Sequence, residues 1–101
     1  MDKRVLDAML EAAESYVDIP DLHEKAGRRI AQMLGCEAAC ISSGAAAGIA
    51  ISAAAIMTGD NEARAMQLPD TTGMKNEAII IKCHRILYDQ ALLLTTIGIK
   101  D

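Results

Sequence analysis

Two short stretches of this sequence carry groups that could do chemistry. The first is Ser43-Gly44-Ala45, which follows a short apolar run and precedes a long run of small apolar residues. This order predicts a strand, a turn at Gly44 and a helix whose first backbone N–H groups are unobstructed. Those amides have no partner within the helix and the helix dipole is positive there, so they could bind a phosphate. A junction of small residues selected only for close packing is the alternative.

The second stretch is His84-Arg85, which follows a continuous β-branched run within residues 77–83. In open α/β sheets, ligands bind beyond the carboxyl ends of the strands, and both stretches are expected there. The imidazole of His84 could lie flat against a planar ligand, and Arg85 could bind an anionic substrate. The alternatives are a histidine that is satisfied as a polar residue at a strand end, and an arginine that is only an exposed charge.

Cysteine and histidine offer a third kind of chemistry. Cys36 and Cys40 have a spacing found in zinc sites, and Cys83-His84 could complete four ligands. Alternate side chains of a strand point to opposite faces, however, and no other residue supports a closed site. We therefore predict no metal site. The sequence also lacks a Ser-His-Asp order, a Walker loop and an H-E-x-x-H motif.

The composition narrows the class of protein. The 101 residues are 51% apolar, which suits one small domain, and the absence of Phe and Trp requires a core of Ala, Ile, Leu and Met. The net charge of −4, with both signs interspersed, gives no electrostatic footprint for nucleic acid or an anionic membrane. The sequence predicts neither a signal peptide nor a membrane span. Three cysteines suit a reducing cytoplasm, which is the expected location.

Apolar spacing predicts the elements that position these residues. Helices are expected over residues 2–16 and 18–34, the second capped by Asp18 and closed by Gly35. A strand is expected over residues 37–42. The remaining elements are predicted to be, in order, a helix over 44–57, a short helical turn capped by Asp60, a strand over 77–83, a helix over 87–97 and a strand beginning at Ile99.

This order indicates a parallel α/β sheet in which the strands over residues 37–42 and 77–83 are neighbours. The helix over 44–57 is expected to pack across one face of that sheet. Two strands and the start of a third fall short of a usual sheet, so we expect the first part of a larger domain.

Four segments together resemble one known family: 22–25 (LHEK), 40–48 (CISSGAAAG), 67–77 (QLPDTTGMKNE) and 82–85 (KCHR). They are similar to the selenocysteine-synthase-like group of pyridoxal-phosphate enzymes, which includes D-glucosaminate-6-phosphate ammonia-lyase. The similarity runs from about residue 17 to the end of the sequence, and segment 67–77 is its most specific part. The resemblance implies the aspartate-aminotransferase fold, a homodimer or higher oligomer, and the cofactor pyridoxal 5′-phosphate.

For the fold, the resemblance implies an α/β class, specifically the N-terminal part of a three-layer parallel-sheet domain with an incomplete sheet and flanking helices. Residues 1–35 would be N-terminal helices. Residues 36–101 would hold the first strands and helices of the cofactor-binding domain.

Carried over to this sequence, the resemblance implies that Ser43, Gly44 and Ala45 hold the cofactor phosphate through backbone amides and a hydroxyl. His84 would stack on the pyridine ring. Arg85 is the candidate for substrate binding. No catalytic residue is assigned within the 101 residues.

Other positions match the family without an assigned role or depart from it. Asp70, Thr71 and Thr72 would lie near the cleft or the subunit interface. Cys83 stands where a small residue such as glycine is expected. The resemblance implies that the Schiff-base lysine and the aspartate that pairs with the pyridine nitrogen lie beyond residue 101. Lys75, Lys82 and Lys100 do not have the family's lysine motif.

Two functions from different classes follow. The first is a fragment of a pyridoxal-phosphate-dependent lyase or transferase that acts on an amino acid or amino sugar. The second is a small non-catalytic α/β or helical module that oligomerises through its apolar surface. A homo-oligomer is expected in both.

Overall fold

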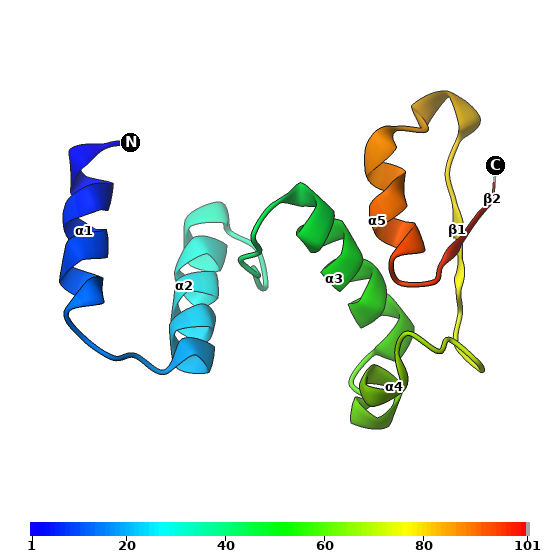
Figure 1. Cartoon of the computed structure of the whole chain (residues 1–101), viewed down its shortest axis with the longest axis horizontal. Helices are drawn as coiled ribbons and strands as arrows, with labels where there is room; N and C mark the ends of the chain where they lie inside the picture. Colours follow the sequence, from blue (N-terminus) through cyan, green and yellow to red (C-terminus); the bar gives the residue numbers. More distant parts are fainter. Residues whose placement is uncertain (101) are drawn as a thin grey trace. The chain divides into compact units, whose positions relative to one another are not determined.

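A computed structural model describes residues 1–100, and their contacts divide the chain into two units (Figure 1). The N-terminal unit is Met1–Ile41 and the C-terminal unit is Ser42–Asp101. Asp101 lies outside the described residues. Each unit is described by itself.

The N-terminal unit contains the two helices that the sequence predicts, α1 (Lys3–Ala13) and α2 (Ile19–Leu34). The side chain of Asp18 accepts a hydrogen bond from a backbone amide in the first turn of α2, which confirms it as the cap. Gly35 ends α2 with a φ of 66°, a left-handed conformation that glycine adopts without strain. These helix boundaries are therefore set by local sequence.

The strand predicted over residues 37–42 is wrong, because these residues form no regular element. The chain instead returns against α2, where the carbonyl oxygen of Ala39 occupies the place that a Cβ on Gly27 would need. A strand requires a neighbour to pair its backbone groups. The described residues provide no such neighbour here, so the predicted pairing with residues 77–83 is also wrong.

The C-terminal unit is built on α3 (Ala45–Thr58), which confirms the predicted helix after Gly44. Asp60 is not the cap of the next helix, because the side chain of Asn61 accepts from the Arg64 amide at 3.1 Å instead. The other elements of this unit are α4 (Glu62–Gln67), β1 (Glu77–Ile79), the 3₁₀ turns η1 (Lys82–His84) and η2 (Leu87–Asp89), α5 (Gln90–Leu93) and β2 (Gly98–Lys100).

The two short strands β1 and β2 form a parallel sheet, with Ala78 opposite Ile99. This confirms the α/β class and the strand predicted to begin at Ile99. The strand predicted over residues 77–83 is too long, because the chain leaves β1 and turns at η1. The helix predicted over 87–97 is also shortened, to η2 and α5.

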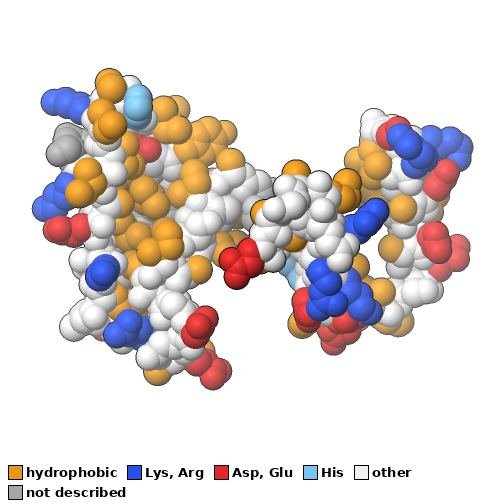
Figure 2. All heavy atoms as spheres, turned by 180° about the vertical axis from the view of Figure 1, so that it is seen from behind, with side chains coloured by type: hydrophobic (Ala, Val, Ile, Leu, Met, Phe, Trp, Pro, Cys, Tyr) orange, Lys and Arg blue, Asp and Glu red, His pale blue; other side chains and the backbone are white. Residues whose placement is uncertain are grey.

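The core of the C-terminal unit is small and aliphatic. Ala53 and Met57 from α3 are buried with Ile97, the residue before β2. In contrast, Ile79 and Ile81 in and after β1 are 85% and 64% exposed. Figure 2 shows hydrophobic side chains gathered over the surface of this unit. The unit therefore covers one face of its strand pair and leaves apolar side chains on its surface.

Within residues 1–100, no helix combines the length and the apolar character that crossing a membrane requires.

Candidate functional site

The start of α3 is open on its N-terminal side. Gly44 precedes the helix with φ 157° and ψ 178°, and no side chain caps the first turn. A Cβ placed on Gly44 would meet no atom within 4 Å. The first intrahelical amide to find a partner is that of Gly48, which donates to the Gly44 carbonyl at 2.9 Å. The amides of Ala45 to Ala47 therefore have no acceptor within the helix and no side-chain cap.

The two serines before this helix have different environments. The Ser42 hydroxyl donates to the Gly44 carbonyl oxygen at 3.0 Å, and a Cβ on Gly48 would lie 3.3 Å from that hydroxyl. The Ser43 side chain is exposed and makes no hydrogen bond among the described residues. Of the two hydroxyls, that of Ser43 is the one available to a ligand.

His84 lies in the segment that follows β1. Its backbone amide donates to the Ile81 carbonyl at 2.8 Å, which closes the turn η1, and its side chain is exposed. In Figure 1 this segment and the start of α3 lie at the same end of the C-terminal unit. Of the two predicted stretches, the His84 segment follows a strand, whereas the start of α3 follows an irregular segment.

Arg85 is held by an ion pair that the sequence analysis missed. Its Nε donates to Oδ2 of Asp89 at 2.6 Å, and the same oxygen accepts from the Ile86 amide at 3.2 Å. The side chain of Asp89 is 11% exposed and that of Arg85 is 38% exposed. The signal in the sequence was an arginine and an aspartate four residues apart, the spacing at which side chains meet on a helical turn.

The polar side chains of the loop from Gln67 to Asn76 form hydrogen bonds with other residues of the same loop. One carboxylate oxygen of Asp70 accepts from the amide and the hydroxyl of Thr72, at 2.9 and 2.6 Å. These two donors hold the pKa of Asp70 below its ordinary value. The side chain of Asn76 donates to the Thr71 hydroxyl at 3.0 Å, and that of Gln67 donates to the Thr72 carbonyl at 2.9 Å. The polar residues of this loop therefore fix its shape.

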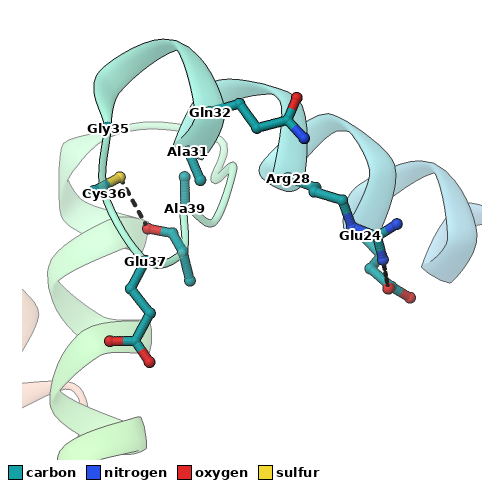
Figure 3. A pocket seen from close by; sticks show the side chains of 9 residues that line it. Glu24, Arg28, Ala31, Gln32, Gly35, Cys36, Glu37 and Ala39 are labelled. Atoms are coloured by element: carbon teal, nitrogen blue, oxygen red, sulfur yellow. Dashed lines mark hydrogen bonds and ion pairs between the residues drawn. The ribbon is translucent and has the colours of Figure 1, made fainter.

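The structure also has two cavities of several hundred Å³, one in each unit. A groove of about 680 Å³ follows α3 from Ala45 to Met57 and is also lined by Lys75 and Ala78, among others. A cavity of about 400 Å³ lies in the N-terminal unit, between α2 and the segment after it (Figure 3). Of the predicted site residues, Ala45 alone lines either cavity.

Figure 3 shows how the cavity of the N-terminal unit is lined. Arg28 and Glu24 form an ion pair along α2, and Cys36 Sγ donates to the Ala38 carbonyl at 3.4 Å. Cys36, Cys40 and Cys83 are free and exposed. Nowhere in residues 1–100 do three or more His, Cys, Asp or Glu side chains gather as a metal site would require.

Known proteins are similar to this chain over most of its length. It is 39% identical over 84 residues to the D-glucosaminate-6-phosphate ammonia lyase of Salmonella typhimurium (strain 14028s / SGSC 2262), covering 83% of this chain and 23% of that protein. It is 40% identical over 95 residues to the 5′-C-glycyluridine monooxygenase-decarboxylase of a Streptomyces species, covering 94% of this chain and 24% of that protein. No family model matches the chain.

A solved structure is also similar. The structure of a D-glucosaminate-6-phosphate ammonia-lyase superposes on all of this chain and on 28% of that chain, with a TM-score of 0.90 and 34% identity. These matches define an α/β enzyme fold of the pyridoxal-phosphate class. The chain belongs to the D-glucosaminate-6-phosphate ammonia-lyase-like family, which confirms the resemblance seen in the sequence. It spans about a quarter of the length of the curated relatives it matches.

Proposed function

We propose that this chain supplies part of a pyridoxal 5′-phosphate site in a lyase or transferase that acts on an amino acid or amino sugar. The observation that carries the proposal is the uncapped start of α3 at Gly44, at the same end of its unit as the segment with His84. A helix N-terminus without a cap offers several amides to an anion. The family of this chain makes a cofactor phosphate the fitting anion.

The residues at the start of α3 fit a phosphate group. Gly44 has no Cβ, and one placed there would meet nothing within 4 Å. The amides of Ala45 to Ala47 would donate to phosphate oxygens, and the Ser43 hydroxyl would add another donor. His84 would lie against the flat ring. When bound, the cofactor supplies an electron sink, and the described residues supply binding and orientation for it.

The names of the relatives support a proposal for the class of substrate. One is named for D-glucosaminate-6-phosphate and the other for 5′-C-glycyluridine, and both names describe amino compounds built on a sugar. We propose that the substrate of this chain belongs to the same broad class. Arg85 is the candidate to bind its anionic group, since a guanidinium pairs well with carboxylate and phosphate.

The surface supports a larger assembly. Ile79 and Ile81 lie on a β-branched run that is typical of a strand covered on both faces, yet both are exposed. We propose that these residues belong to the three-layer cofactor domain, with residues 1–35 as its N-terminal helices and the rest as its first strands and helices. A homo-oligomer in the cytoplasm, without nucleic acid or membrane partners, completes the proposal.

A second candidate function is a non-catalytic module that oligomerises through its apolar surface. The observation that favours it is the exposure of large apolar side chains, such as Ile56 at 83% and Leu87 at 89%. Surfaces of this kind mark contact sites between polypeptides. This candidate predicts association without any binding of the cofactor.

The test is a titration of the isotope-labelled chain with pyridoxine 5′-phosphate, followed by NMR. This analogue has no aldehyde and cannot react with lysines. We expect shifts in the amides of residues 43–47 and in the His84 ring. Pyridoxine without its phosphate should cause no shift at residues 43–47, and neither response would be seen for the non-catalytic module.

Substitutions at Ser43 and His84 test whether these two residues contribute to cofactor binding. Ser43→Ala should weaken binding by about ten- to a hundredfold, because a hydrogen bond to a charged group contributes about 1.5–3 kcal/mol. Ser15→Ala, an exposed serine of the N-terminal unit, is the matched control and should bind as the parent does. His84→Phe should retain the stacking that His84→Ala loses. Equal affinity in all four variants would contradict the proposed site.

A further inference from the structure

We infer that two copies of this chain exchange their first helices, so that α1 of each copy docks in the apolar groove along α3 of the other. The groove is the one of about 680 Å³ that α3 lines from Ala45 to Met57. This inference rests on the homo-oligomer that is part of the proposed function, and it names the two surfaces through which that oligomer forms.

The helix α1, at the N-terminal end of the chain in Figure 1, has an apolar face that the single chain does not bury. It is 11 residues long, and none of its residues is buried. Isolated helices of this length are marginally stable in water, and most helices in proteins depend on the packing of an apolar face. The face of α1 consists of residues whose exposed fractions range from 45% to 68%, namely Val5, Leu6, Met9 and Leu10. A partner surface would therefore stabilise α1.

The groove along α3 matches α1 in length and in chemistry. An 11-residue helix is about 17 Å long, and the part of α3 that lines the groove is about 20 Å long. The groove is lined by small residues at Gly48 and Ser52, which allow a second helix to approach closely, and by Ile56, which is 83% exposed. An amphipathic helix in an apolar groove is a recurring mode of recognition, and α1 has the required spacing of apolar residues.

The charges of the two surfaces are complementary and set the direction of α1. Its C-terminal half ends with Glu11 and the cap residue Glu14, and it contains no lysine or arginine. Lys75 lines the groove at the C-terminal end of α3, where Arg64 lines an adjoining cavity. None of these four side chains forms an ion pair within residues 1–100. We therefore expect α1 to lie parallel to α3, with its acidic end near Lys75.

A second copy of the chain is the occupant that these features favour. An exchange of helices makes the same contact twice, once in each groove, and so closes at a dimer. It uses an element that is already formed in each copy, which makes exchange a low-cost route to dimers. Residues 14–18, which connect α1 to α2, form no helix or strand, so the direction of α1 can differ there between the free and the docked chain.

The experiment uses the full chain, with sedimentation equilibrium for its association and NMR for the environment of α1. Protection of the α1 amides from hydrogen exchange should rise with protein concentration, because docking stabilises the helix. A mixture of carbon-13-labelled and unlabelled chains should give a nuclear Overhauser effect between the methyl group of Met9 in one copy and a methyl group of Ile56 in the other.

Substitutions on each surface have matched controls at exposed positions of the same helix. Leu6→Glu places a charge on the apolar face of α1 and should weaken dimerisation about tenfold or more. Its control is Ala8→Glu, outside that face. Ser52→Arg obstructs the groove and should have a similar effect, and its control is Ala55→Arg, at a position of α3 that does not line the groove. The controls should change the dissociation constant by no more than about twofold.

Charge reversal tests the direction of α1. Lys75→Glu and Glu14→Lys should each weaken dimerisation about two- to fivefold, the range for exposed ion pairs. The chain that carries both substitutions should recover the dissociation constant of the parent. A double variant that dimerises more weakly than either single variant would overturn the parallel arrangement. Circular dichroism establishes that every variant has the helix content of the parent.

An oligomer that Leu6→Glu and Ser52→Arg leave unchanged would overturn the inference, although the homo-oligomer itself would stand. A parent chain that is monomeric at micromolar concentration would overturn both. A nuclear Overhauser effect between Met9 and Ile56 only within one chain would show that α1 occupies its own groove, and this would also overturn the exchange. Failure of the cofactor site has a different signature, because residues 43–47 would not respond to pyridoxine 5′-phosphate while the dimerisation stayed as described.

Discussion

Replacing Gly44 by alanine tests whether the turn before α3 depends on backbone conformation. Gly44 has φ 157° and ψ 178°, a region of the backbone map that residues with a Cβ almost never occupy. A Cβ at this position would meet nothing within 4 Å. Any loss of stability in Gly44→Ala must therefore come from backbone strain and not from a clash.

The magnitude follows from two opposing terms. A non-glycine residue in this region costs about 1–3 kcal/mol. Alanine also restricts the unfolded chain, which favours folding by about 0.4–1 kcal/mol. We therefore expect Gly44→Ala to lower the free energy of unfolding by about 1–2 kcal/mol. For a unit of this size, each kcal/mol corresponds to about 4–8 °C in Tm.

Thermal and urea unfolding, followed by circular dichroism at one protein concentration, measure this change. Gly48→Ala is the control, because Gly48 lies inside α3 and a Cβ there would lie 3.3 Å from the Ser42 hydroxyl, a tight contact that a shift of a few tenths of an ångström relieves. Alanine in a helix interior is favoured over glycine by about 1 kcal/mol, so this variant should be at least as stable as the parent. Equal stability of Gly44→Ala and the parent, or a larger loss in Gly48→Ala, would refute the reasoning.

Three further outcomes are expected. Thr72→Val should raise the pKa of Asp70 by removing a hydroxyl donor, as carbon-13 NMR of the carboxyl would measure. Because the pKa of Asp70 is lower in the folded state, the ionised carboxylate stabilises the loop at pH values above the ordinary pKa. This stabilisation is lost as the pH falls through the folded-state pKa. An Asp70 pKa that is the same in Thr72→Val and the parent would contradict this expectation. Pyridoxal 5′-phosphate and borohydride should leave no single stoichiometric lysine adduct by mass spectrometry, and one such adduct on Lys75, Lys82 or Lys100 would contradict the site. Light scattering at micromolar concentration should show dimers or larger species, and a 10.7 kDa monomer with a cooperative melt would disprove this expectation.

The helices could be predicted from the sequence because their signals are local. Asp18 and Gly35 mark the two ends of α2 through a side-chain cap and a left-handed residue, and neither needs a distant partner. The run of small apolar residues after Gly44 likewise gives α3. The open turn at Ser43 and Gly44 could be located for the same reason, since a glycine before an apolar helix is visible in the sequence.

The strands could not be predicted to the same extent because they depend on distant residues. Residues 37–42 are apolar enough for a strand, but a strand forms only where another lies beside it. Gly27 allows the chain to approach α2 instead, and nothing in the spacing of Gly27 and Ala39 reveals that contact. The β-branched run after Glu77 pairs only as far as β2 extends.

The same limit explains why Asp89 was missed. Its spacing from Arg85 is a local signal, but its burial depends on how α5 packs, with the neighbouring Ala91 only 4% exposed. A surface ion pair and a buried one have the same spacing in the sequence. The difference between them, which makes Asp89 of interest, appears only in the folded structure.

The uncapped start of α3 has a thermodynamic consequence. An anion that accepts hydrogen bonds from the amides of Ala45 to Ala47 would serve as the missing helix cap. Binding of the anion and ordering of the first turn of α3 would therefore be thermodynamically coupled. A ligand that binds only the folded state at a hundredfold excess over its Kd stabilises that state by about 2.7 kcal/mol. Fraying of the first turn of α3 would then decrease in proportion to the fraction of sites filled. The exchange rates of three backbone amides would report directly how much ligand is bound.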